Sequence, residues 1–195
     1  IFRNDEPLSF DRTRNKALAE ADLVMVVGTP FDFRLSYGKT VNPAAKVVQI
    51  DQNYAVIGKN HDITLGLLGH AGTIFRAVID ALSGRVEYGA RSKRQAWIRE
   101  LRQAEEKALE KLMPLFRSEN SLINPYRVAY ELNEFLEEDT IYVGDGGDVV
   151  TISAQAVRPR NPGQWMDPGP LGSLGVGTGF AIGAKLAHPA KKYFA

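Results

Sequence analysis

The first part of the chain consists of short apolar runs separated by segments with helical spacing of apolar residues. The runs are as long as typical strands, and the segments between them are as long as typical helices. Runs at 23–27, 46–50 and 63–68 are apolar along most of their length, which is typical of buried parallel strands. Between and around them, 12–20 and 71–82 have helical spacing, the second with Ile74, Phe75, Val78 and Leu82 on one face. The pattern predicts an α/β fold, with a parallel sheet that helices cover on both faces, as in half of a Rossmann-like domain.

A polar, glycine-containing stretch at 83–90 separates this part from a charged segment at 91–113. That segment carries one apolar helical stripe, formed by Trp97, Leu101, Ala104, Ala108 and Leu112. It predicts an amphipathic surface helix that ties two domains together and ends at Pro114. The acidic residues on the helix argue against a calmodulin-binding or membrane-surface helix.

The α/β rhythm begins again after residue 123. Asn124 is a good N-cap, and Pro125 suits the first position of a helix that we expect to run to Leu136. A strand at 140–143, a helix at 149–157, an irregular proline-containing loop and a glycine-rich helix at 175–187 follow. Residues 191–195 have the pattern of a strand that has just begun, so we expect the polypeptide to be incomplete. The predicted division is 1–88, a helical linker at 89–120, and 121–195.

Composition and charge exclude several kinds of binding partner and metal site. The 195 residues are 44% hydrophobic and 24% charged, with a formal net charge of +1, as in soluble globular proteins. This balance favours neither nucleic acid nor an anionic membrane as a partner. The chain has no cysteine, which excludes disulfides and thiolate metal sites and is compatible with the cytoplasm. The stretch 171–187, which is poor in charge, is too short and too rich in glycine for a membrane span.

The most informative motif is Gly144-Asp145-Gly146-Gly147-Asp148, which stands between a predicted strand and a predicted helix. Glycines in such a turn let backbone amides converge on one point, and the helix N-terminus adds positive potential, so the motif can hold an anion. A tight strand-to-helix turn that uses glycine only for its backbone freedom is an equally good interpretation of the motif alone.

A second glycine-rich motif runs from Asp167 to Gly175 and leads into a helix. At the start of that helix, 172–174, we expect a ligand contact. Gly175, Gly179 and Gly183 are spaced four residues apart and form a smooth stripe. For Gly179 and Gly183 we expect close packing against a neighbouring element.

Residues 144–189 resemble the first half of the diphosphate-binding domain of thiamine-diphosphate enzymes, most of all acetolactate-synthase-like proteins, a group that includes the 2-hydroxyacyl-CoA lyases. The resemblance implies that thiamine diphosphate is the cofactor. It places Gly146, Gly147 and Asp148 at the phosphates. It also implies that Gly172 and Ser173 offer backbone groups to the aminopyrimidine, and that Leu174, where many relatives carry Met, supports the bent cofactor.

The stretch 21–34 resembles the middle domain of the same family, with the pattern Gly-x-x-Phe-Asp-x-Arg, and 48–51 resembles the strand that follows. This domain binds FAD in acetolactate synthases and ADP in oxalyl-CoA decarboxylases. The resemblance makes four residues candidate nucleotide contacts: Gly28, Asp32, Arg34 and Asp51. Pro30 stands where flavin-binding relatives often carry Arg. A local salt bridge between Asp32 and Arg34 that fixes the loop is an alternative.

The family's chemistry also needs groups that the chain does not contain. The glutamate that activates the cofactor belongs to the pyrimidine-binding domain, and the Gly-Asp-Gly…Asn motif that holds Mg²⁺ is expected beyond Ala195. We therefore predict no catalytic residue and no metal ligand within this chain, and no turnover by the isolated chain.

For the parent protein, the resemblance implies a homodimer or homotetramer. Its leading reaction is acetolactate formation from a 2-keto acid, as in branched-chain amino acid biosynthesis. Cleavage of a 2-hydroxyacyl-CoA to an aldehyde and formyl-CoA is an alternative, because 165–172 resembles the lyase branch. A non-catalytic, nucleotide-binding regulatory module is a third.

Overall fold

The computed structural model describes residues 6–85 and 91–195 of the chain. It has two compact units, and each is described by itself. The amino-terminal unit is Thr13–Ala104, and the carboxy-terminal unit joins the chain up to Arg12 with Glu105–Ala195. Both contain a parallel three-stranded sheet with helices beside it, which confirms the α/β class. The finer division at residues 88 and 120 stays a prediction.

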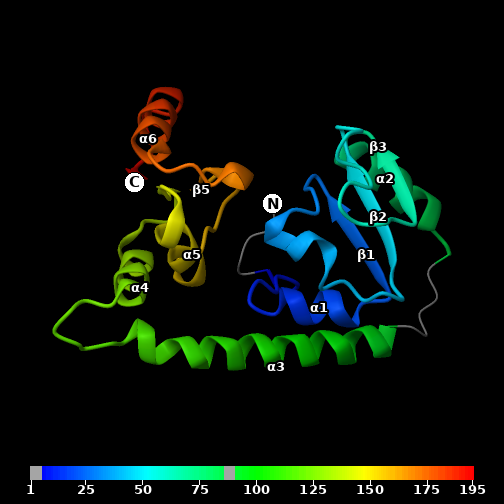
Figure 1. The fold of residues 1–195 in the computed structure, drawn as a ribbon, viewed down its shortest axis with the longest axis horizontal. Helices are drawn as coiled ribbons and strands as arrows, with labels where there is room; N and C mark the ends of the chain where they lie inside the picture. Colours follow the sequence, from blue (N-terminus) through cyan, green and yellow to red (C-terminus); the bar gives the residue numbers. More distant parts are fainter. Residues whose placement is uncertain (1–5, 86–90) are drawn as a thin grey trace. The chain divides into compact units, whose positions relative to one another are not determined.

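The amino-terminal unit is built on the sheet β1-β2-β3, in which all strands are parallel (Figure 1). The strands are β1 (Leu23–Val27), β2 (Lys46–Asp51) and β3 (Leu65–Leu68). The third strand therefore starts two residues later than the apolar run predicts. The other elements are α1 (Arg14–Glu20), the 3-10 helix η1 (Phe33–Gly38) and α2 (Ala71–Leu82), which has the predicted bounds.

One face of this sheet carries the core of the unit. Val24, Val26 and Val47 point to that face and pack with Phe31 and Val41, all of them almost fully buried. On the opposite face, Met25, Val48 and Leu65 stand in register across the three strands. Met25 is 39% exposed and Leu65 49% exposed, so the described residues leave much of this second face open. Ile50 on the same face is fully buried, so the cover that the sequence pattern predicts for both faces is present on one face and partial on the other.

The long helix α3 (Arg91–Phe116) contains Pro114 instead of ending there, so the predicted stop is wrong. Proline lacks the N–H for one helical hydrogen bond, but here only two residues follow it, so the cost is confined to the last turn. Packing holds that turn in place. Phe116 is 1% exposed and its ring stacks on Tyr130 at a centroid distance of 5.2 Å.

The carboxy-terminal unit contains the sheet β5-β4-β6, again parallel throughout. All three residues of its central strand are buried. The elements that the structure assigns after α3 are α4 (Pro125–Phe135), β4 (Ile141–Val143), α5 (Gly147–Ala156), β5 (Trp165–Met166), the 3-10 helix η3 (Gly169–Leu171), α6 (Val176–Ala187) and β6 (Tyr193–Phe194). Strand β5 lies within the segment that the sequence predicts to be irregular, and β6 is the strand predicted at 191–195.

Capping and ion pairs account for two local features of this unit. Asn124 Oδ1 accepts a 2.9 Å hydrogen bond from the backbone N–H of Tyr126, with Pro125 at the first position of α4, as predicted. Arg12 donates to Glu105 Oε1 at 3.3 Å and to the Gln155 carbonyl at 2.7 Å. The segment before residue 13 is thereby attached to α3 and α5.

Each unit contains one tryptophan whose indole N–H donates to a carboxylate. Trp97 donates to Glu20 Oε2 at 3.1 Å, and Trp165 donates to Asp167 Oδ2 at 2.7 Å. Within the ranges that the structure describes, no helix is both long enough and apolar enough to span a membrane.

Candidate cofactor site

The carboxyl end of β4 leads directly into the glycine turn. Gly146 and Gly147 have φ angles of +80° and +60°, which L side chains rarely adopt, so this turn requires glycine. Helix α5 starts at Gly147, two residues earlier than predicted, and its N-cap Gly146 supplies no side chain to the first amides. These amides and the helix dipole make an anion seat at the end of a buried strand, where ligands bind in parallel α/β sheets.

The second glycine turn is fixed at its start by Asp167. Its Oδ1 accepts from the backbone N–H of Gly169 at 2.6 Å, and its Oδ2 accepts from Trp165. Two more glycines, Gly172 and Gly175, have φ of +62° and +85°, and Gly175 is the N-cap of α6. The turn therefore holds Ser173 and Leu174 between two positions that glycine suits best.

The two turns meet. A Cβ placed on Gly146 would lie 2.8 Å from Leu174 Cδ2 and 3.3 Å from the Ser173 carbonyl oxygen. Leu174 thus packs on the backbone of Gly146, yet 73% of its surface is exposed. Gly147 is also close, because its Cβ would lie 3.6 Å from the same Leu174 atom. The structure brings Gly146 and Gly147, which the resemblance places at the phosphates, close to two residues that it places at the aminopyrimidine, Ser173 and Leu174.

The residues present fit a diphosphate group. The cradle has no Cβ at Gly146 or Gly147, and the start of α5 has no side-chain cap that would compete with an anion. Asp148 lies in the first turn of α5 and is exposed. Among the residues that the structure describes, no group of three or more His, Cys, Asp or Glu could hold a metal ion.

The candidate nucleotide contacts lie at the carboxyl ends of β1 and β2. Gly28 follows β1 and donates to the Ile50 carbonyl at 2.9 Å, next to Asp51 at the end of β2. Asp51 Oδ1 accepts from the backbone N–H of Asn53 at 2.8 Å. Asp51 and Gly28 therefore share the edge of the sheet at which β1 and β2 end.

Asp32 and Arg34 form the local ion pair that the sequence offers as an alternative. Arg34 Nη2 donates to Asp32 Oδ2 at 2.8 Å, and Arg34 Nε donates to Asp32 Oδ1 at 3.1 Å. Asp32 also accepts from the backbone N–H of Arg34 and so caps η1. Hydrogen bonding by the Arg34 side chain lowers the pKa of Asp32. In this structure the pair fixes the loop, and a nucleotide role for either residue stays a prediction.

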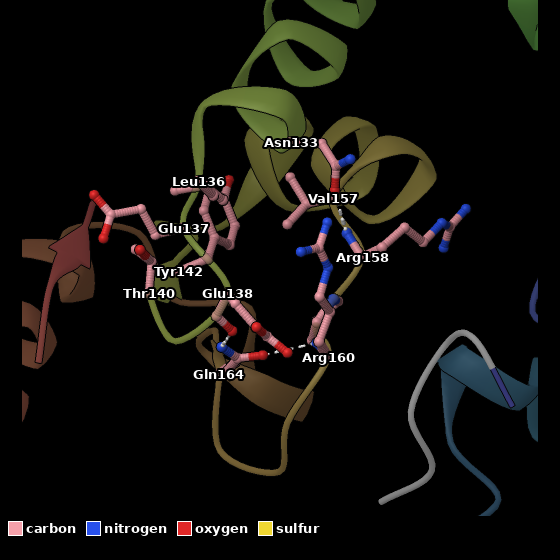
Figure 2. Close-up of a pocket in the computed structure, with 11 residues that line it drawn as sticks. Asn133, Leu136, Glu137, Glu138, Thr140, Tyr142, Val157, Arg158, Arg160 and Gln164 are labelled. Carbon is pink, nitrogen blue, oxygen red and sulfur yellow. Dashed lines mark hydrogen bonds between the residues drawn. The ribbon is translucent and has the colours of Figure 1, made fainter.

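A small hollow opens at the other end of β4, near Thr140 and Tyr142 (Figure 2). The Gln164 side chain accepts from the backbone N–H groups of Arg160 and Asn161 and donates to the Glu138 carbonyl. Burial raises the pKa of Tyr142, whose hydroxyl donates to Ser153 Oγ. These groups are satisfied by one another, so the hollow is structural.

The sequence alone does not single out Asp145 as a site residue. Its Oδ1 is buried without a hydrogen-bond partner among the described residues, and its side chain lies against Gly177 of α6. The glycine at 177 is the only sequence signal, and its meaning depends on contacts between segments about 30 residues apart.

Comparison with known proteins agrees with this arrangement. Residues 1–80 match the family described as "Thiamine pyrophosphate enzyme, central domain", and residues 145–195 match "Thiamine pyrophosphate enzyme, C-terminal TPP binding domain". The chain is 38% identical to 2-hydroxyacyl-CoA lyase 2 of Danio rerio, over 97% of the chain and 30% of that protein. It is 36% identical to the Caenorhabditis elegans protein of the same name, over 100% of the chain and 31% of that protein.

A third relative is the acetolactate synthase large subunit IlvG of Mycobacterium tuberculosis, 34% identical over 96% of the chain and 33% of that protein. The chain thus spans about a third of the length of these relatives. The first family match covers all three strands of the amino-terminal sheet, and the second begins just after β4 and contains the Gly146–Gly147 and Gly172–Gly175 turns. The chain belongs to the thiamine pyrophosphate enzyme family, and it carries sequence of the central and the C-terminal cofactor-binding domains.

Proposed function

We propose that this chain is part of a longer thiamine-diphosphate enzyme and that its paired glycine turns hold the cofactor. Gly146, Gly147 and Asp148 lie at the diphosphate, and Gly172, Ser173 and Leu174 lie at the aminopyrimidine. The observation that carries this proposal is the contact of Leu174 with Gly146, because it joins the two halves of the seat.

The residues of this chain bind and orient, while the bound cofactor supplies the chemistry that makes or breaks a carbon–carbon bond beside a carbonyl. The amides at the start of α5 would hold the phosphates, and the helix dipole would add to the attraction. Leu174 offers an exposed apolar surface on which a ring can rest. From the family resemblance we expect the activating glutamate and the Mg²⁺ ligands in other parts of the complete protein, and we expect no turnover by these 195 residues alone.

For the reaction, we place cleavage of a 2-hydroxyacyl-CoA first. The relatives with this name are 34–38% identical, and the segment 165–172 resembles their branch. Acetolactate formation from pyruvate is the second candidate. It is supported by the 34% identity to an acetolactate synthase and by the pattern from Gly28 to Arg34.

The test uses the complete protein with thiamine diphosphate and Mg²⁺, and then with either one omitted. A 2-hydroxyacyl-CoA is offered in one reaction and pyruvate in another. Cofactor-dependent aldehyde formation from the CoA ester supports the lyase. If the protein instead forms acetolactate from pyruvate in a cofactor-dependent way and does not cleave the ester, the acetolactate synthase activity is the better assignment. A protein that binds ADP but not thiamine diphosphate would be a regulatory module, and the proposal would be wrong.

We further propose that the edge formed by Gly28 and Asp51 takes the adenosine part of FAD or ADP. A carboxylate at the end of a parallel strand can accept hydrogen bonds from a ribose. Visible absorbance of the purified complete protein would reveal a flavin, and calorimetric titration with ADP would detect the alternative. The complete protein is expected to be a homodimer or homotetramer, which light scattering measures.

A further inference from the structure

A second contact joins the two glycine turns. Asp145 lies in the turn after β4, and Gly177 lies in the first turn of α6. A Cβ placed on Gly177 would lie 2.9 Å from Asp145 Cβ and 3.3 Å from Asp145 Oδ2. Gly177 is buried and its backbone is not left-handed. The lack of a side chain at Gly177 therefore makes room for Asp145 and is not needed for the backbone conformation.

The charge of Asp145 suits this position. Helix α6 has Gly175 as its N-cap, without a side-chain cap, and no acidic residue in its first turn. A negative charge is stabilised at a helix N-terminus, and here it comes from the neighbouring turn. Asp145 Oδ1 is buried and makes no hydrogen bond within the part of the chain that the structure describes. The starts of two helices are close to this carboxylate, because Asp145 directly precedes Gly146, the N-cap of α5, and packs on Gly177 in the first turn of α6.

The two contacts are reciprocal. Leu174 of the second turn packs on Gly146 of the first, and Asp145 of the first packs on Gly177 behind the second. We propose that Asp145 is a positioning residue: packed on Gly177, it sets the separation of the turns and so places Leu174 for the cofactor. The inference rests on the proposed cofactor site, and Asp145 acts in it through Gly177, without touching the cofactor.

The test measures the dissociation constant of thiamine diphosphate by calorimetry, on the complete protein with saturating Mg²⁺. Gly177→Ala introduces a methyl group into the Asp145 contact, and we expect the constant to rise about tenfold. Gly179→Ala is the matched control, because no atom of the described residues lies within 4 Å of that Cβ position, so the close packing predicted for Gly179 is not found among these residues. The control should bind within about twofold of wild type.

Two further variants separate positioning from general damage. Asp145→Asn keeps the shape that packs on Gly177 and removes a negative charge beside the proposed diphosphate site, so we expect its affinity to fall by no more than about twofold. Adding Asp145→Gly to Gly177→Ala removes the clashing atoms, so the double variant should bind more tightly than Gly177→Ala alone. Affinities that instead follow the free energies of unfolding of the same variants, measured by urea denaturation, would mean that lost stability and not positioning is responsible.

Wild-type affinity in a folded Gly177→Ala variant would overturn the inference. If that variant does not fold, the single variant Asp145→Gly decides, because it removes the atoms that pack on Gly177, and unchanged affinity there overturns the inference equally. A wild-type protein that does not bind thiamine diphosphate would overturn the proposed function itself, and the inference with it. Binding by the wild type together with equal binding by the variants rejects the positioning role alone.

Discussion

Tyr142 donates a 2.6 Å hydrogen bond to Ser153 Oγ in the interior of the carboxy-terminal unit, and so ties the central strand β4 to α5. Tyr142 is 3% exposed and Ser153 5% exposed. Because both partners are buried, neither hydroxyl can turn to water when the other is removed. The bond holds the base of the helix whose first residues form the anion seat.

Tyr142→Phe should lower the free energy of unfolding by about 1 kcal/mol at neutral pH, because Ser153 loses its partner. Burial raises the pKa of Tyr142, so the folded state keeps the proton when the unfolded state has lost it. The free energy of unfolding of the wild type therefore falls above about pH 10, whereas the variant has no hydroxyl at this position to ionise. Urea unfolding at neutral and alkaline pH should show that the difference in free energy of unfolding between wild type and variant becomes smaller as the pH rises. Tyr54→Phe is the control, because Tyr54 is 79% exposed. A difference in free energy of unfolding between wild type and Tyr142→Phe that grows with pH would contradict the stabilising role of the Tyr142 hydroxyl.

Gly146→Ala should weaken the binding of thiamine diphosphate by the complete protein about tenfold or more. Its methyl group would meet Leu174 Cδ2 at 2.8 Å, in a backbone conformation with φ of +80°. Gly163→Ala is a close match, since its φ is +82° and nothing lies within 4 Å of its Cβ position. Both variants carry the same backbone strain, and only the first one disturbs the seat. Equal losses of affinity would mean that strain, and not the Leu174 contact, is responsible.

Glu105→Gln should lower the free energy of unfolding by roughly 3 kcal/mol, because it leaves the Arg12 cation in a buried site without its countercharge. The side chains of Arg12 and Glu105 are only 12% and 11% exposed. Glu131→Gln is the comparison. Its partner Arg127 is 36% exposed and Glu131 itself 55%, so its loss should cost about 0.5 kcal/mol or less. Chemical denaturation measures both, and similar values for the two would refute the argument from burial.

Asn124→Ala should cost about 1 kcal/mol, because the backbone N–H of Tyr126 loses its acceptor at the start of α4. Asn120→Ala, in the exposed loop before the helix, should have little effect. Thermal unfolding followed by circular dichroism compares them. A larger effect at Asn120 would show that the loop, and not the cap, stabilises this region.

Elements that depend on local signals were predictable. The apolar run of β1 and the helical spacing of α2 give their observed bounds, and Asn124 with Pro125 marks the start of α4. The Asp32–Arg34 pair was also predictable as an alternative, because residues two apart in a loop can meet without any help from the rest of the fold.

The rest depends on contacts between distant segments. Strand β5 is two residues long and exists because Trp165 and Met166 pair with β4, which no periodicity reveals. Helix α3 continues past Pro114 because Phe116 packs on α4. In the site, the roles of the two glycine turns come from family resemblance, whereas their contact through Leu174 and Asp145 is visible only in three dimensions.

The two tryptophans that donate hydrogen bonds to carboxylates can serve as fluorescent probes of the two units. The chain has two tryptophans in all, and each sheet unit contains one of them, Trp97 beside Glu20 and Trp165 beside Asp167. Replacing either indole by Phe leaves a single fluorophore whose emission reports on one unit alone. Two such variants would show whether the units melt together or in sequence, and Trp165 would report on the turn that contains Leu174.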